Sequence, residues 1–267
     1  MSRVIAIANQ KGGVGKTTTA INLGAGLAVA ERRTLVVDMD PQGNATSGLG
    51  IDKNAVETST YDVLIGNVPV EDAIRRGLHF PLLDVLPSSQ DLVGAEVELV
   101  EGQGRELRLR HALAGVRERY DYVLLDCPPS LGLLTLNTLA AADTVLIPIQ
   151  CEFYALEGLS QLLNTIRLVQ QSLNPRLQVE GVLLTMFDQR LNLSRQVAEE
   201  AKEYFGSRVF ASVIPRNVRL AEAPSFGKPI AVYDILSAGS QSYLALANEI
   251  IAHDASRSAA SAEEGAA

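Results

Sequence analysis

Residues 10–18 form a glycine-rich segment whose composition and position fit a phosphate-binding loop. The segment follows an apolar run at residues 4–8 and precedes a helix-like stretch that begins at Lys16, so it would connect a strand to a helix. Glycines let backbone N–H groups converge on an anion, and the helix N-terminus adds the positive end of its dipole. Lys16 would reach the β- and γ-phosphates of a nucleotide, and the Thr17 hydroxyl would bind Mg²⁺. The predicted nucleotide contacts in this loop are Lys11, Gly12, Gly13, Val14, Gly15, Lys16, Thr17 and Thr18.

Carboxylates end two later strand-like runs. Asp38 and Asp40 close the run that begins at residue 34, beside a turn rich in proline and glycine. A carboxylate there can position or deprotonate the water that attacks a γ-phosphate; alternatively, both aspartates cap the turn, Asp38 more readily than Asp40. Asp126 ends the run 122–126 in the manner of a Walker B motif, whose carboxylate holds Mg²⁺ directly or through a bound water.

Strand-like and helix-like stretches alternate along the chain, and they must position these residues. Most of the strand-like runs are continuously apolar, which is typical of parallel strands covered on both faces. The alternation predicts an α/β fold with a doubly wound, mostly parallel sheet, helices on both faces and the ligand at the carboxyl ends of the strands. The expected strands are residues 4–8, 34–38, 83–86, 122–126, 144–149, 179–185 and 209–214, and the expected helices are 16–30, 105–119, 133–141, 156–173, 193–205 and 237–253.

Composition favours one soluble domain. The chain has 267 residues, of which 47% are hydrophobic, which is enough for a sizeable core. Residues 1–253 are expected to form a single domain, with 50–104 decorating one edge of the sheet, and the small-residue tail 254–267 is expected to be disordered. With neither a charged-then-apolar leader nor a membrane-spanning run, the protein is expected to be cytoplasmic. Cys127 and Cys151 are expected to be reduced and semi-buried.

The charge is distributed unevenly. The net charge of −8 argues against uniform attraction to nucleic acid, yet residues 189–228 hold seven basic and four acidic side chains, a net +3 that leaves −11 for the rest. Such a basic region can bind phosphates on one face of an acidic protein. The alternative is a set of helix-surface arginines that pair with neighbouring glutamates.

The phosphate-binding loop departs from the ordinary pattern, which requires glycine at the position of Gln10, and it carries a second lysine, Lys11. It resembles the deviant Walker A loop of the ParA/MinD superfamily of ATPases. The resemblance implies an ATP-dependent sandwich dimer in which Lys11 reaches the nucleotide of the second subunit, although Lys11 could also be a solvated loop lysine. It also implies that Asp40 positions the attacking water and that Asp38 supports the Mg²⁺ region, so the implied catalytic residues are Lys11, Lys16 and Asp40, and the implied metal site is Thr17, Asp38 and Asp126.

Two later segments extend the resemblance to almost the whole chain. Residues 214–225 resemble the base-binding segment of ParA proteins, so Pro215 and Asn217, together with Met186 at the end of the preceding strand, are expected to line the adenine pocket. Residues 150–158 also fit the family, and Glu152 could approach the nucleotide or the partner subunit, or cap the following helix.

Within the superfamily, the chain most resembles chromosome-partitioning ATPases of the ParA/Soj type. Its end lacks the basic amphipathic helix of the membrane-bound MinD-like division regulators, and Cys127 lies in an Asp-Cys-Pro-Pro segment shared by partitioning proteins, which argues against an iron–sulfur role. Because the chain begins at its first strand, without room for a helix-turn-helix extension, sequence-independent binding to double-stranded DNA is expected. The resemblance implies that this DNA contacts Arg190 and Arg219, with Arg195, Lys202 and Arg216 as helpers.

The resemblance also implies a nucleotide-timed cycle. An ATP-bound homodimer would coat the nucleoid, and a ParB-type centromere-binding partner would stimulate a slow intrinsic, Mg²⁺-dependent hydrolysis and so release the DNA. A related ATPase that positions a protein cargo, a polymerising scaffold and a MinD-like regulator remain alternatives.

Overall fold

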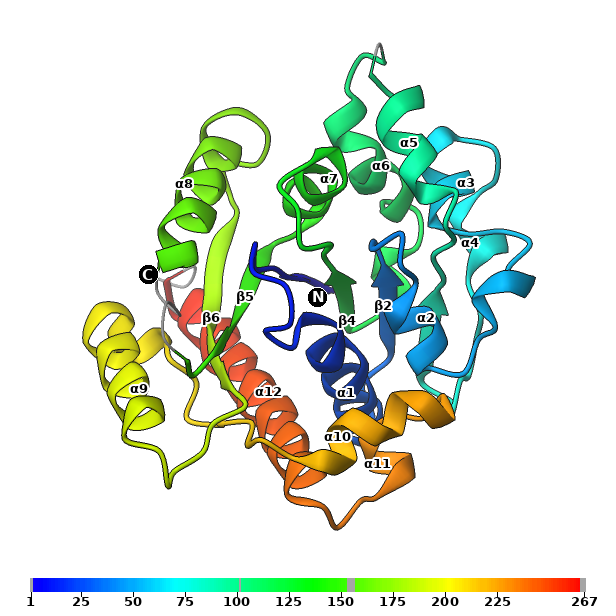
Figure 1. The fold of residues 1–267 in the computed structure, drawn as a ribbon. Helices are drawn as coiled ribbons and strands as arrows, with labels where there is room; N and C mark the ends of the chain where they lie inside the picture. Colours follow the sequence, from blue (N-terminus) through cyan, green and yellow to red (C-terminus); the bar gives the residue numbers. More distant parts are fainter. Residues whose placement is uncertain (1, 101, 153–156, 265–267) are drawn as a thin grey trace.

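The computed structural model describes residues 2–100, 102–152 and 157–264. Within them, six strands form one parallel sheet in the order β3-β2-β4-β1-β5-β6, and helices cover both of its faces (Figure 1). The strands are β1 Arg3–Ile7, β2 Thr34–Asp38, β3 Leu83–Leu86, β4 Tyr122–Asp126, β5 Thr144–Gln150 and β6 Gln178–Thr185. This is the doubly wound α/β architecture that the alternation of elements predicts.

The central strands are buried along their whole length. Every residue of β2 and β4 is buried, which explains why their sequences are continuously apolar and why their bounds could be predicted residue for residue. Their register pairs Asp38 with Asp126, and the register of β1 with β4 pairs Ile7 with Asp126. The carboxyl ends of β1, β2 and β4 therefore lie at the same edge of the sheet, where the chain enters the glycine-rich loop.

Helices α1 and α12 cover one face of the sheet and lie side by side (Figure 1). Two glycines of α1 permit close packing, Gly24 against the sheet and Gly26 against α12. A Cβ atom on Gly24 would lie 2.7 Å from a side-chain carbon of Val36, and one on Gly26 would lie 3.2 Å from the carbonyl oxygen of Tyr243. The bounds of the helices are α1 Lys16–Val29, α2 Asn44–Gly48, α3 Thr60–Ile65, α4 Val70–Ala73, α5 Leu92–Glu98, α6 Arg108–Leu113, α7 Leu133–Ala141, α8 Glu157–Ser172, α9 Asn192–Phe205, α10 Val218–Glu222, α11 Ile230–Tyr233 and α12 Ala238–Glu264.

The expected strand at residues 209–214 is not a strand of the sheet, and this prediction was wrong. The segment makes isolated bridges to β6 and to the residues that follow it, Val209 with Val182 and Pro215 with Phe187. Between these bridges, the backbone N–H groups of residues 211 and 212 donate to the carboxylate of Glu249 on α12, at 2.7 and 2.9 Å. Because those donors are taken by a side chain, they do not continue the ladder.

Two helical regions also differ from their expected bounds. The single helix expected at residues 105–119 is divided into a 3-10 turn (Arg105–Leu107), α6 and a second 3-10 turn (Arg117–Arg119). Helix α12 continues past residue 253, where the domain was expected to end. In this extension Asp254 pairs with Arg3 and accepts a 2.8 Å hydrogen bond from the hydroxyl of Tyr122, which attaches the helix to the start of β1 and β4.

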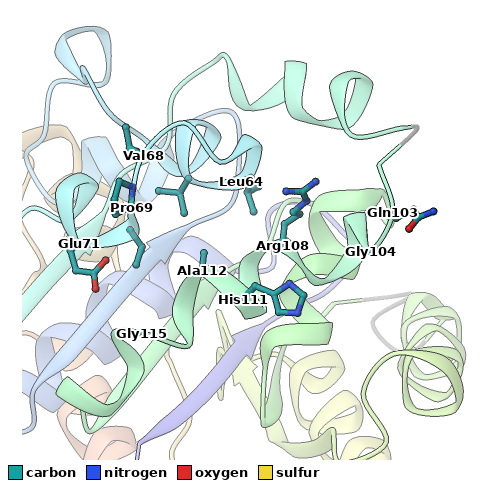
Figure 2. A pocket seen from close by; sticks show the side chains of 12 residues that line it. Leu64, Val68, Pro69, Glu71, Gln103, Gly104, Arg108, His111, Ala112 and Gly115 are labelled. Atoms are coloured by element: carbon teal, nitrogen blue, oxygen red, sulfur yellow. The ribbon is translucent and has the colours of Figure 1, made fainter.

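The segment between β2 and β4 builds a small helical region beside the sheet (Figure 1). Helices α3, α4 and α6 enclose a pocket of about 570 Å³ there, with Val68 and Pro69 on one wall and Arg108 and His111, both on α6, on the other (Figure 2). None of the residues that line it belongs to the expected phosphate, metal or base contacts. Among the described residues, no helix is both long enough and apolar enough to cross a membrane.

Candidate nucleotide-binding site

The glycine-rich loop has the backbone geometry of an anion-binding site. Gly13 and Gly15 have positive φ angles of 74° and 90°, a region that side-chain-bearing residues rarely adopt. Gly15 is the N-cap of α1, and no side chain caps this helix end, so its first backbone N–H groups are left for a ligand. The loop and the start of a 14-residue helix are thus arranged to cradle a phosphate group.

The two lysines of the loop are turned in different directions. Lys16 is 7% exposed, and its ammonium donates to the carbonyl oxygen of Lys11 at 3.1 Å. Burial lowers the pKa of Lys16, an effect that the nearby carboxylates of Asp126 and Asp40 oppose. The Lys11 side chain is exposed and has no hydrogen-bond or ion-pair partner in the described part of the chain. Lys16 therefore serves the loop of its own chain, whereas Lys11 is available to a group outside it.

Asp126 is the feature that best fits an absent cation. It is fully buried, and neither of its carboxylate oxygens has a hydrogen-bond partner among the described residues. Burial and the proximity of Asp38 raise its pKa well above the usual range. The Thr17 hydroxyl, which lies close by but outside hydrogen-bond geometry, and Lys16 lower it only in part. A buried carboxylate without partners is costly unless a ligand satisfies it, and Mg²⁺ prefers oxygen ligands of this kind.

Asp38 has a different environment, although it is the register neighbour of Asp126. One of its oxygens accepts from the backbone N–H and the hydroxyl of Thr46, at 2.8 and 2.7 Å, and the other accepts from the backbone N–H of Asp40 at 3.1 Å. Burial raises the pKa of Asp38 to about 6, while these hydrogen bonds oppose the shift. The structure thus shows Asp38 holding the turn and the start of α2, which is the capping arrangement that the sequence left open.

Asp40 lies two residues further along, in the turn itself. It is 8% exposed, and one carboxylate oxygen accepts from the backbone N–H of Gln42 at 3.0 Å. Its other oxygen has no hydrogen bond within the described residues, and its negative charge acts on Lys16. Asp40 therefore lies near enough to the phosphate-loop lysine for its charge to oppose the lowering of the pKa of Lys16.

The expected base contacts come together with the loop. A pocket of about 220 Å³ brings Gly15 and Thr18 to Met186, Pro215 and Asn217. The remaining residues of its lining are Thr185, Ile214, Arg216, Leu220, Ala221 and Tyr243. Its mainly apolar walls beside a phosphate-binding loop suit a planar base joined to phosphates.

Three residues that support the site were not predicted from the sequence. The hydroxyl of Thr185 lies 2.8 Å from the carbonyl oxygen of Val14 and so attaches the loop to the end of β6. The amide of Asn9 donates to the carbonyl oxygen of Pro148 at 2.7 Å and its oxygen accepts from the backbone N–H of Lys11 at 3.0 Å. Tyr243 closes the base pocket from α12 and hydrogen-bonds Thr19 at 3.1 Å. Of these, only Asn9 had a signal in the sequence, as a polar residue directly after an apolar strand.

Comparison with known proteins identifies the family. A family model described as an AAA domain matches residues 2–179. The chain is 59% identical over 258 residues to the chromosome partitioning protein ParA of Myxococcus xanthus, covering 97% of this chain and 91% of that protein. It is 60% identical over 253 residues to the sporulation initiation inhibitor protein Soj of Bacillus subtilis, covering 95% and 100%. The chain belongs to the ParA/Soj family of chromosome-partitioning proteins.

A solved structure supports the same fold. A protein from Mycobacterium smegmatis, described as cobyrinic acid a,c-diamide synthase with bound ADP and magnesium, matches this chain with a TM-score of 0.83 and 41% identity over 95% of both chains. The expected ParA/MinD-type fold and the family resemblance are therefore confirmed.

The residues of this ParA-family chain fit a magnesium–nucleotide complex. No cluster of three or more His, Cys, Asp or Glu side chains that could hold a metal occurs among the described residues. Such a cluster is not required, since Mg²⁺ commonly binds one or two protein groups together with substrate phosphates and waters. Here the Thr17 hydroxyl and Asp126 are the groups in place. Cys127 and Cys151 are both free, as expected, but they are fully buried rather than semi-buried, and burial raises the pKa of Cys151 to about 12.

The expected DNA-contacting residues lie around α9 and α10, which flank α12 (Figure 1). Arg190 forms a bidentate pair with Asp188, with distances of 2.9 and 2.7 Å, and this pairing lowers the pKa of Asp188 to about 2. Arg216 donates to Glu152 at 3.0 Å, which places Glu152 beside the basic region. Residues 153–156 of the family-like segment 150–158 lie outside the described residues.

The other three basic side chains have mixed environments. Arg219 pairs with Glu222 at 3.0 Å and with Asp234 at 3.6 Å. Arg195 donates to the side chain of Asn192, and Lys202 has no ion-pair partner in the described part of the chain. Arg190 and Arg216 both act on Asp188, whereas Arg195 and Lys202 lie on α9 and Arg219 lies on α10. All five are exposed, and three of them are paired with carboxylates of their own chain.

Proposed function

We propose that the chain is a Mg²⁺-dependent ATPase that partitions chromosomes by switching between a free state and a DNA-bound dimer. The observation that carries this proposal is the difference in burial between the two loop lysines. Lys16 is buried beside the position expected for phosphates, whereas Lys11 is exposed on the same loop without a partner in the described residues. A second chain facing this loop would bring its own Lys11 to the nucleotide, where an ammonium group could neutralise phosphate charge away from water.

In this proposal Thr17 and Asp126 hold Mg²⁺, and the N–H groups of residues 12–17 hold the phosphates. Bound Mg²⁺ supplies positive charge that offsets the charge of the β- and γ-phosphates. Lys16 binds the phosphates, and Asp40 orients the attacking water and takes its proton. The adenine lies against Met186 and Pro215. Asp38 contributes indirectly, because it holds the turn that carries Asp40.

The dimer then binds double-stranded DNA without regard to sequence. Arg190, Arg195, Lys202, Arg216 and Arg219 contact phosphates, and dimerisation doubles this basic surface so that weak contacts act together. A ParB-type partner stimulates hydrolysis and releases the dimer, which is otherwise associated with the nucleoid. Support comes from the family membership and from the exposure of all five basic side chains.

A DNA mobility assay tests the proposal. The protein is mixed with two duplexes of unrelated sequence in the presence of ATP, ADP or no nucleotide, and the assay is repeated across a series of salt concentrations. We expect retention of both duplexes with ATP alone, and a loss of affinity as salt rises. Binding that is independent of nucleotide would refute the switch. An ATP-dependent dimer that ignores DNA at every salt concentration would instead favour a protein cargo.

A further inference from the structure

Helix α5 exposes an aliphatic stripe that the fold does not use. Val93, Val97 and Val100 are spaced so that they share one face of α5 and its C-terminal continuation, and they are 57%, 73% and 54% exposed. The opposite face is also apolar, since Leu92 and Leu99 are buried in the core. The rest of the chain covers only one of these two apolar faces and leaves the other exposed. We call the exposed face, formed by Val93, Val97 and Val100, the valine stripe.

The valine stripe lies at the carboxyl edge of the sheet, near the nucleotide site. The chain enters α5 directly from the end of β3, through a segment in which the backbone N–H of Ser88 donates to the Thr46 hydroxyl at 2.9 Å. That hydroxyl is the one that donates to Asp38. Figure 1 shows α5 near the periphery of the molecule, beside α3, with which it packs.

A second connection links α5 to the loop that follows Asp126. A Cβ atom on Gly132 would collide with the carboxylate of Glu96, so this loop and α5 are in direct contact. Leu131, the residue before this glycine, is a further apolar side chain of this loop and is 39% exposed. The loop that connects Asp126 to α7 therefore reaches from the expected magnesium position to the helix that carries the valine stripe.

We infer that the valine stripe is part of the surface that a second copy of this chain covers in the nucleotide-bound dimer. The inference rests on the dimer of the proposed function and adds a contact to it. Exposed aliphatic side chains gain free energy when they are covered, and this stripe follows β3 at the same carboxyl edge of the sheet as the loop on which Lys11 is exposed. A second copy is the occupant that the position favours, since Lys11 and the valine stripe would be covered in the same event.

Sedimentation velocity with a non-hydrolysable ATP analogue tests the inference. The wild type is compared with the triple variant Val93→Ser, Val97→Ser, Val100→Ser, and with the matched control Leu168→Ser. Leu168 is 63% exposed on the last turns of α8, which lead to the amino end of β6, at the opposite edge of the sheet. We expect the triple variant to dimerise at least about tenfold more weakly than the wild type, because both copies lose the stripe, and the control to match the wild type. Binding of a fluorescent ATP analogue to monomers should be equal in all three.

A second measurement covers the case in which the triple variant is misfolded. The single variants Val97→Cys and Leu168→Cys are treated with a bulky maleimide, since both native cysteines are buried. We expect the ATP analogue, but not ADP, to slow labelling at position 97 by about tenfold, with no change at position 168. Equal dimerisation of wild type and triple variant, or equal labelling at position 97 with both nucleotides, would overturn the inference alone. A wild type that stays monomeric would overturn the proposed dimer as well.

Discussion

Replacing Asp126 with asparagine should stabilise the nucleotide-free protein while removing its response to magnesium. Both carboxylate oxygens of Asp126 are buried without a hydrogen-bond partner in the described residues, and burial together with Asp38 disfavours the ionised form. An unsatisfied buried polar atom costs about 1–3 kcal/mol, and an unpaired charge costs more. Asparagine keeps the shape and cannot ionise, so at pH 7.5 it avoids the free energy that the raised pKa of Asp126 costs, and we expect the free energy of unfolding in EDTA to rise by about 2 kcal/mol.

Asp38 provides the matched control for this change. It is equally buried at the paired register position, but its oxygens accept hydrogen bonds from Thr46 and Asp40. In Asp38→Asn, one of these acceptors becomes an NH₂ group that faces a backbone or hydroxyl donor. We therefore expect Asp38→Asn to gain less stability than Asp126→Asn, because the lost hydrogen bonds, worth about 1–3 kcal/mol, offset the removal of a buried charge.

Urea unfolding at pH 7.5 measures both effects, first in EDTA and then with Mg²⁺ and ADP. The wild type should gain more stability from Mg²⁺–ADP than Asp126→Asn does, because the variant has lost an anionic ligand. The order of stability of the two proteins should therefore reverse when the ligands are added. If Asp126→Asn is less stable than the wild type in EDTA, Asp126 is not an uncompensated charge, and the argument for a cation at this position fails.

Further outcomes follow from individual residues. Because burial raises the pKa of Asp38 to about 6, the folded state binds its proton more tightly than the unfolded state does, so urea titrations in EDTA should show stability rising by about 1 kcal/mol per pH unit as pH falls from 6 to 5. Gly12→Val should leave the monomer's melting temperature unchanged, since nothing lies within 4 Å of a Cβ there, while sedimentation with ATP shows no dimer. Asp40→Ala should dimerise with ATP but release no phosphate, and normal turnover would remove Asp40 from the mechanism. Changing Arg190 and Arg219 together to Glu should abolish DNA retention in the mobility assay without affecting dimerisation, and unchanged retention would refute the assigned surface.

Much of the fold could be predicted from the sequence because the central strands are buried on both faces. The bounds of β2, β3 and β4 were predicted residue for residue, and the structure brings the phosphate loop, Asp126 and the base-binding segment together. The wrong prediction of a strand at residues 209–214 has a cause that lies far away in the chain. Glu249 takes two backbone donors of this segment, and no local pattern indicates that a glutamate on a distant helix will do so.

The environments of the charged residues could not be predicted from the sequence either. Local spacing could place Asp38 and Asp126 at strand ends, but it could not show that one is satisfied by Thr46 and that the other has no partner among the described residues. The difference depends on which backbone donors meet each carboxylate after folding. For the same reason, the sequence left open whether the arginines are free or paired, and the structure shows Arg190 and Arg219 paired.

The pairing of these arginines changes what a salt titration of DNA binding would mean. Asp188, Glu222 and Glu152 act as resident counterions for Arg190, Arg219 and Arg216. When a phosphate replaces such a carboxylate, the guanidinium exchanges one anion for another, and the displaced carboxylate must recruit cations from the solution. The net number of ions released is then smaller than the number of arginines in contact, so the logarithm of affinity should fall less steeply with salt than five basic contacts per subunit would require.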